Sequence, residues 1–160
     1  RCGVPLFAIA AKQRNPYIDA WMNRQYGDGL DVVERGSARV MAEIKARLSK
    51  GQCFAILPDL RVPTKDVEVP FLNGTANVSH GGASFATGVG SPVVVAIMRR
   101  EDGKHVFDHL GTLRPDPSLS RKEDSIRLTR ETMALLDAAI KKTPEHWFWY
   151  NKRWILQPVQ

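Results

Sequence analysis

An aspartate that closely follows a short apolar run is the side chain of this sequence best placed to do chemistry. The run Cys53-Phe54-Ala55-Ile56-Leu57 has the length and composition of a buried strand, and Pro58, which lacks an N–H, ends it before Asp59. Ligands of open α/β sheets bind at the carboxyl ends of the strands. A carboxylate at such a position, followed by the cations Arg61 and Lys65, predicts either a functional site or a capped loop.

The elements that would position this aspartate alternate between strands and helices. Strands are expected at residues 3–10, 30–33, 53–57 and 93–98 and, after a hairpin turn at Glu101-Asp102-Gly103-Lys104, at residues 105–113. Helices are expected from the Asn15 cap to Gly27, from the Ser37 cap to Gly51, from Ser79 to Gly90, and from the Ser120 cap to Pro144. This alternation is typical of an α/β fold and predicts a mostly parallel sheet flanked by helices.

Three of the expected helices carry an apolar face that could pack on the sheet. These faces are Ile18, Trp21, Met22 and Gln25 in the first helix, Val40, Met41, Ile44 and Leu48 in the second, and Ile126, Thr129, Met133, Leu136 and Ile140 in the last. The second helix also carries a group of cations, which are Arg39, Lys45, Arg47 and Lys50.

Length and charge limit what the chain can do. Its 160 residues suffice for one domain with a buried core, and its net charge of +6 favours anionic partners: phosphorylated lipid, an acidic carrier protein or nucleic acid. The two cysteines, Cys2 and Cys53, have no metal-ligand spacing and indicate a reducing compartment. The longest apolar run, residues 93–98, is too short to span a bilayer. Because Arg1 leads directly into the first expected strand, we interpret the chain as a piece of a longer polypeptide.

An ordered series of short motifs covers nearly the whole chain. The series is Asn15-Pro16-x-Ile18-Asp19, Leu57-Pro58-Asp59, Val69-Pro70-Phe71-Leu72-x-Gly74-x-Ala76, Gly82, Ala86, Gly90-x-Pro92-Val93-Val94, Arg99 and Pro144-Glu145-His146-Trp147-x-Trp149-x-x-Lys152-Arg153-Trp154. No single motif is specific, but the series resembles the bacterial lipid A biosynthesis (lauroyl/myristoyl) acyltransferases of the lysophospholipid acyltransferase superfamily. The resemblance implies a glycerolipid acyltransferase-like fold, in which residues 1–160 form the C-terminal part of a single domain.

The resemblance also implies an activity and its partners. The expected reaction transfers a fatty acyl group from acyl carrier protein, or from coenzyme A, to a hydroxyl of a phosphorylated glycolipid. The acyl thioester is a co-substrate, and neither a further cofactor nor a metal is expected. The full-length enzyme would work on an anionic membrane surface at the cytoplasmic face of the inner membrane. A glycerophosphate-type acyltransferase of the same superfamily is the nearest alternative, although the tryptophan-rich C-terminus argues against it.

The family's general base is a histidine in a His-x-x-x-x-Asp/Glu motif, and this pattern fails for every histidine here. Five residues after His80, His105, His109 and His146 stand Phe85, Leu110, Arg114 and Asn151. The family places the motif just upstream of the strand that begins here at Gly3. We therefore expect the base to lie outside these residues and the 160-residue chain to be inactive by itself.

The remaining candidate site residues follow from the resemblance. Asp59 matches the aspartate at the strand end and would organise the site electrostatically, and Arg24 lies within about a residue of the family's arginine after the first helix. Lys65 and Arg99 are candidates for phosphate contacts, because cations at strand ends suit phosphate groups. The segment from Val69 to Gly74, with Phe71 and Gly74, would line the acyl or glycan cleft, although Phe71 could equally belong to the core.

The C-terminal segment combines aromatic rings with cations. Trp147, Trp149, Lys152 and Arg153 could face a membrane interface, or the rings could simply cover the sheet. Stacking on nucleic acid would use the same residue types, so a basic nucleic-acid-binding module is the alternative from a class without catalysis. The lipid interpretation, which we favour, expects no nucleic-acid partner.

Overall fold

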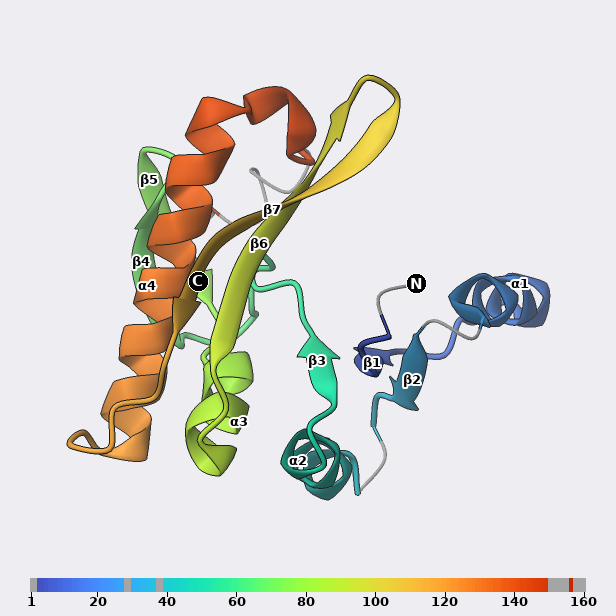
Figure 1. Ribbon diagram of the computed structural model, residues 1–160, viewed down its shortest axis with the longest axis horizontal. Coiled ribbons are helices and arrows are strands. Elements are labelled where there is room, and N and C mark those ends of the chain that lie inside the picture. Colours follow the sequence, from blue (N-terminus) through green and yellow to red (C-terminus); the bar gives the residue numbers. More distant parts are fainter. Residues whose placement is uncertain (1–2, 28–29, 37–38, 150–155, 157–160) are drawn as a thin grey trace. The chain divides into compact units, whose positions relative to one another are not determined.

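Two compact units, Arg1–Ile56 and Leu57–Gln160, make up the chain. Figure 1 shows the computed structural model, which describes residues 3–27, 30–36, 39–149 and 156. The expectation that residues 1–160 belong to a single domain stays a prediction.

The first unit is a three-stranded parallel sheet with two crossover helices. The sheet order is β2-β1-β3, and Phe7 of β1 pairs with Asp31 of β2 on one side and with Phe54 of β3 on the other. The elements are β1 (Leu6–Ala10), α1 (Pro16–Tyr26), β2 (Asp31–Glu34), α2 (Val40–Ser49) and β3 (Cys53–Ala55). This half therefore has the parallel α/β arrangement that the sequence predicts.

Helix α1 begins and ends where its capping residues predict. The side-chain oxygen of Asn15 accepts hydrogen bonds from the backbone N–H of Tyr17 at 2.9 Å and of Ile18 at 3.4 Å, and Gly27 ends the helix. Its predicted apolar face is not buried in this unit, since no residue of α1 is buried and Trp21 is 56% exposed.

The core of the first unit forms around two side chains that are fully buried. Phe7 stacks on Phe54 with 5.0 Å between ring centroids, and Ile44 of α2 is equally inaccessible. The Arg47 guanidinium lies 5.4 Å from the centre of the Phe7 ring. The cap residue of α2 is Arg39, and the predicted cap Ser37 lies outside the described residues.

The second unit consists of two antiparallel hairpins and a long helix. The hairpins are β4 (Val67–Phe71) with β5 (Gly74–Val78), and β6 (Val93–Glu101) with β7 (Lys104–Leu113). The helices are α3 (Gly81–Val89), α4 (Arg121–Lys142) and the short 3₁₀ helix η2 (Pro144–His146).

The prediction of a mostly parallel sheet is only partly correct. The apolar run 93–98 forms part of β6 as predicted, but its partner is β7 in an antiparallel pair. The predicted turn at 101–104 is present, with Asp102 and Gly103 both at positive φ, and a two-residue turn of this kind joins antiparallel strands. Among the described residues, only β1, β2 and β3 are parallel.

Helix α4 supplies the common core of the second unit. Four residues of its predicted face are buried: Thr129, Met133, Leu136 and Ile140. The last three form a hydrophobic cluster with Phe71 and its neighbours in β4 and β5. Figure 1 shows the helix lying along both hairpins. Its start has the predicted capping box, in which Ser120 and Glu123 each accept the other's backbone N–H.

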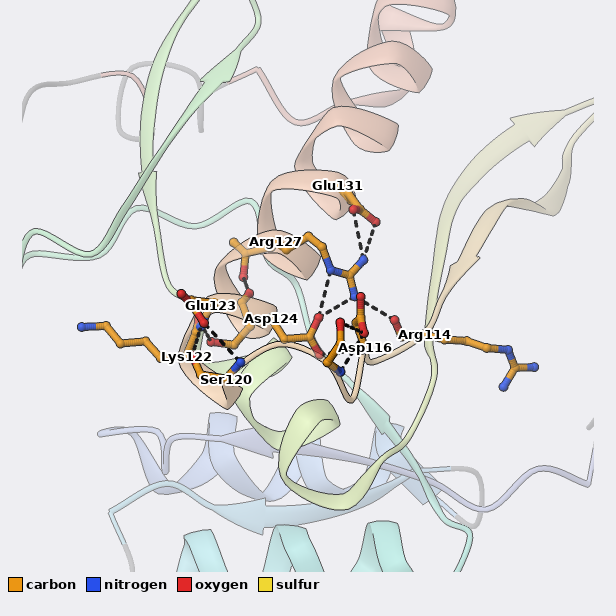
Figure 2. A network of polar contacts seen from close by, with 11 residues as sticks. Arg114, Asp116, Ser120, Lys122, Glu123, Asp124, Arg127 and Glu131 are labelled. Carbon is orange, nitrogen blue, oxygen red and sulfur yellow. Dashed lines mark hydrogen bonds and ion pairs between the residues drawn. The ribbon is translucent and has the colours of Figure 1, made fainter.

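A network centred on Asp124 joins the first turns of α4 to the loop before it (Figure 2). The Asp124 side chain is only 3% exposed; it accepts the Asp116 backbone N–H at 3.0 Å and two N–H groups of Arg127 at 2.9 and 2.5 Å. Arg127 also donates to both carboxylate oxygens of Glu131 and to the Arg114 carbonyl. The buried charge of Asp124 is thus fully compensated, as a buried carboxylate requires.

The β4–β5 turn places a leucine in a left-handed backbone conformation, which is unfavourable for this residue. Leu72 and Asn73 have φ values of 47° and 62°, and a left-handed leucine costs about 1 kcal/mol or more. The Leu72 N–H donates to Asp137 of α4 at 2.6 Å, and Asp137 also accepts from Lys141 at 2.7 Å. Burial raises the pKa of the Asp137 carboxyl, but these two hydrogen bonds and the positive charge of Lys141 together outweigh it, and the pKa lies below its ordinary value of 3.8.

We expect Asp124→Asn to lower the free energy of unfolding by about 1–3 kcal/mol, the range for a hydrogen bond to a charged group. The amide keeps the shape but leaves the Arg127 guanidinium without its buried counter-charge. Urea denaturation measures the change. Arg121→Gln, an exposed change in the same first turn, should stay within about 0.5 kcal/mol. An Asp124→Asn protein as stable as the wild type would show that the network contributes nothing.

The lowered pKa of Asp137 predicts a loss of stability in acid. Well above pH 3.8 the carboxylate is charged in both states and its hydrogen bonds contribute fully. As the pH falls below 3.8, the unfolded state binds the proton first, so the free energy of unfolding decreases until the folded carboxylate is also protonated. Asp137→Asn should flatten this part of the curve of stability against pH, measured by denaturation from pH 5 to 2. An unchanged acid slope would contradict the assignment.

Candidate functional site

A polar cavity of about 280 Å³ lies at the carboxyl ends of β1 and β2 in the first unit. Its lining is Ala10, Ala11, Lys12, Gln13, Asp19, Met22, Asn23, Tyr26, Val32 and Glu34. Asp19 is oriented by the Gln13 backbone N–H at 2.8 Å and by the Asn23 amide at 3.4 Å. This is the edge at which parallel α/β sheets bind ligands. Its amides, its two carboxylates and its single lysine suit a hydroxylated group.

Arg24 is exposed in the last turn of α1 and does not line this cavity. Its proposed role in catalysis stays a prediction.

Asp59, the central residue of the sequence prediction, belongs to the second unit and is partly buried. The strand expected over residues 53–57 ends at Ala55, so Asp59 lies four residues beyond its end. The indole N–H of Trp147 donates to Oδ2 of Asp59 at 2.9 Å, across 88 residues of sequence. This hydrogen bond joins two motifs that the sequence analysis treated separately.

Trp147 is held between two other aromatic rings. Its ring meets Phe71 edge-on at 6.0 Å and Trp149 edge-on at 5.2 Å, and the Trp149 indole donates to the Pro144 carbonyl at 2.5 Å. Phe71 is 1% exposed, so it is a core residue in this unit, whereas Trp149 is 43% exposed. Of the two interpretations of the C-terminal rings, packing fits Trp147; Lys152 and Arg153 lie outside the described residues.

Gly74 follows the β4–β5 turn, close to the same cluster. A Cβ at this position would lie 3.4 Å from the Leu156 side chain, which itself packs against the core. Neither of the cavities described in the two units is lined by Asp59, Phe71 or Gly74. Their role in lining a substrate cleft stays a prediction.

The predicted phosphate-binding cations have different surroundings. The Lys65 side chain is 74% exposed and lies 3.8 Å from Glu68. Arg99 pairs with Asp108 and, at 2.9 Å, with Glu101. The hydrogen bond that Arg99 donates to Asp108, followed by the one that it donates to Glu101, raises the pKa of Arg99. A phosphate would compete with these carboxylates for Arg99, whereas Lys65 is more accessible.

A histidine–aspartate pair was missed by the sequence analysis. The His80 Nδ1 atom contacts a carboxylate oxygen of Asp66, and the His80 backbone N–H donates to the other at 3.3 Å. The buried Asn77 amide accepts the Asp66 N–H at 2.8 Å and donates to two carbonyls of the same loop. The two residues are 14 positions apart and the aspartate comes first, so no search for His-x-x-x-x-Asp/Glu could find the pair.

The order of motifs along the chain agrees with a known family. The model of the bacterial lipid A biosynthesis acyltransferases matches residues 2–155. The chain belongs to this family. The sequence resemblance is therefore confirmed, and the chain is a member of an acyltransferase family of lipid A biosynthesis. No individual curated protein gave a match.

The Asp59–Trp147 hydrogen bond matters for this family because it connects the second motif of the series with the last one, within one unit. None of the helices in the described part of the chain is both long and apolar enough to cross a membrane.

A double-mutant cycle tests whether Trp147 holds Asp59. Trp147→Phe removes the N–H donor but keeps a ring, and Asp59→Asn weakens the acceptor. We expect the two changes to be coupled by about 1 kcal/mol in the free energy of unfolding, the usual value for a hydrogen bond of this kind. The same cycle with Trp149→Phe, whose indole donates to Pro144, is the control and should give a smaller coupling. Equal coupling in both cycles would argue against a specific bond.

Proposed function

We propose that this protein takes part in the transfer of a fatty acyl group from the thioester of acyl carrier protein, or of coenzyme A, to a hydroxyl of a phosphorylated lipid A precursor. The match of the lipid A acyltransferase family over residues 2–155 is the observation that carries the proposal. The net charge of +6 also supports it, because both the carrier protein and the phosphorylated acceptor are anionic.

The reaction needs a base and a stabilised oxyanion. The acceptor hydroxyl oxygen attacks the thioester carbonyl while a base takes the hydroxyl proton, and the carbonyl oxygen becomes negative in the tetrahedral intermediate. Collapse of that intermediate forms the ester and breaks the C–S bond, and the departing thiolate takes the proton that the base had accepted.

Asp59 can orient groups in this site but cannot itself stabilise a negative oxygen. Its Oδ2 is engaged by Trp147, and no hydrogen bond from a described residue reaches Oδ1. In our proposal Oδ1 accepts hydrogen bonds from the hydroxyl groups of the acceptor, and the negative charge is needed for this role.

The base belongs, in our proposal, to a segment outside these 160 residues. No histidine of the chain is followed by an acid at the fifth position, and the His80–Asp66 pair faces neither of the described cavities. The 160-residue chain alone should therefore give no acyl transfer above a buffer control.

The rate of acyl transfer in a longer protein that includes a His-x-x-x-x-Asp/Glu segment tests the role of Asp59. Asp59→Asn should keep the fold and slow transfer of labelled acyl groups by roughly ten- to a thousandfold, the effect of removing one preorganised electrostatic group. Asp102→Asn is a matched control, since Asp102 is exposed in the turn between β6 and β7. Full activity in a well-folded Asp59→Asn enzyme would make Asp59 a structural residue, and transfer by the 160-residue chain alone would overturn the placement of the base.

We also propose that the protein works at the cytoplasmic face of the inner membrane, drawn there by exposed lysines. Arg47 is a poor candidate for this role, because it pairs with Asp31 and Glu43, both at 2.9 Å. The exposed Lys45 and Lys50 are better ones, and each would contribute about 1 kcal/mol near an anionic surface.

Cosedimentation with vesicles tests this localisation. Binding should rise with anionic lipid content, weaken as salt is added, and fall when Lys45 and Lys50 are both changed to Gln. Changing both Lys152 and Arg153 to Gln tests whether the C-terminal segment contributes to vesicle binding; the binding should weaken if that segment faces lipid. Equal binding to neutral and anionic vesicles, with tight oligonucleotide binding, would instead favour a nucleic-acid-binding module.

A further inference from the structure

A second cavity, of about 440 Å³, lies within the second unit, and neither Asp59 nor Arg24 lines it. It is lined by the β6–β7 hairpin, by one face of the last turns of α4, and by the residue after that helix. The lining residues are Ile97, Phe107, Asp108, His109, Leu110, Leu135, Ala138, Ala139, Lys142 and Thr143. Its volume lies within the range of roughly 300–1,000 Å³ that is usual for small-molecule sites.

The walls of this cavity are mainly aliphatic and aromatic. Leu135, Ala138 and Ala139 are spaced three and four residues apart on one face of α4. On the hairpin side, a β-bulge leaves Leu110 without a partner in β6, and Phe107 remains 63% exposed. An apolar ring left this exposed beside an apolar wall favours an apolar ligand.

Among the charged groups that line the cavity, only Lys142 lacks a partner among the described residues, so the end of the cavity at Lys142 is positively charged. The Asp108 carboxylate is neutralised by Arg99, and the His109 ring is hydrogen-bonded to Thr112 at 2.9 Å. Lys142, in the last turn of α4, makes no ion pair with any described residue. The carbonyl end of the helix, equivalent to about half a negative charge, favours the ammonium there but does not neutralise it.

We propose that this cavity binds a single fatty acyl chain that carries an anionic head group, with the chain along Leu135, Ala138 and Phe107 and the head group on Lys142. An apolar wall with one unpaired cation at its end is complementary to such an amphiphile. The proposal does not rest on the proposed acyl transfer, because no residue assigned a part in that reaction lines the cavity.

Binding of laurate to the 160-residue chain, measured by calorimetry below the concentration at which laurate forms micelles, tests the proposal. We expect saturable binding of one laurate, no binding of butyrate, and weaker binding of dodecyltrimethylammonium than of laurate. Ala138→Trp should abolish laurate binding by filling the cavity. Ala134→Trp, one turn earlier, also exposed and outside the lining, should leave binding unchanged.

Lys142 is tested separately, by a variant that leaves the cavity open. Lys142→Gln should weaken laurate binding roughly two- to fivefold, the effect of one partly solvated charge pair, and should leave the affinity for dodecanol unchanged. Lys122→Gln in the first turn of the same helix is the matched control. Circular dichroism verifies the fold of each variant. Laurate binding that survives Ala138→Trp, or that is lost equally in both tryptophan variants, would overturn the proposal, as would equal affinity for dodecyltrimethylammonium.

Discussion

Burial of one face of α4 is the constraint on which the second unit depends. A two-stranded hairpin is marginally stable by itself in water, because it has no second layer against which to bury its apolar face. Here two such hairpins pack on one helix of 22 residues, whose Leu128 and Met133 are fully buried. The start of that helix is in turn held by the Asp124 network. The packing of both hairpins therefore relies on a single helix and on the correct position of its first turn.

The same helix positions the candidate site. Its last residue is followed within two positions by the η2 turn, and Trp147 comes directly after that turn. Trp147 packs against Phe71 and holds Asp59, while Asp137 of α4 holds the strained turn that follows Phe71. The Asp59 carboxylate is thus oriented through core packing as well as through its own loop. A site built in this way requires that the hydrophobic core and the polar contacts form together.

Local signals were predictable from the sequence, and long-range partners were not. The Asn15 cap, the Ser120–Glu123 capping box and the turn after Glu101 depend on residues only a few positions apart, and all three occur as predicted. The sheet was predicted to be mostly parallel because helices alternate with apolar runs along the chain. The prediction failed for β6 and β7 because an apolar run shows burial but not strand direction. Asp59 was recognised from its position after a strand, yet its donor Trp147 is 88 residues away. No spacing rule connects residues so far apart, since only packing of the whole unit brings them together.

The positive charge of the chain is also distributed in a way that composition does not show. Arg47, Arg99 and Arg127 are each held by two carboxylates, as suits a planar guanidinium that can donate to both. Lys12 and Lys142 line the two cavities, and neither forms an ion pair with a described residue. These three arginines therefore stabilise the two units, whereas Lys12 and Lys142 remain available to a ligand in their cavities. A net charge of +6 is consistent with many anionic partners, but only cations without an internal counter-charge can select among them.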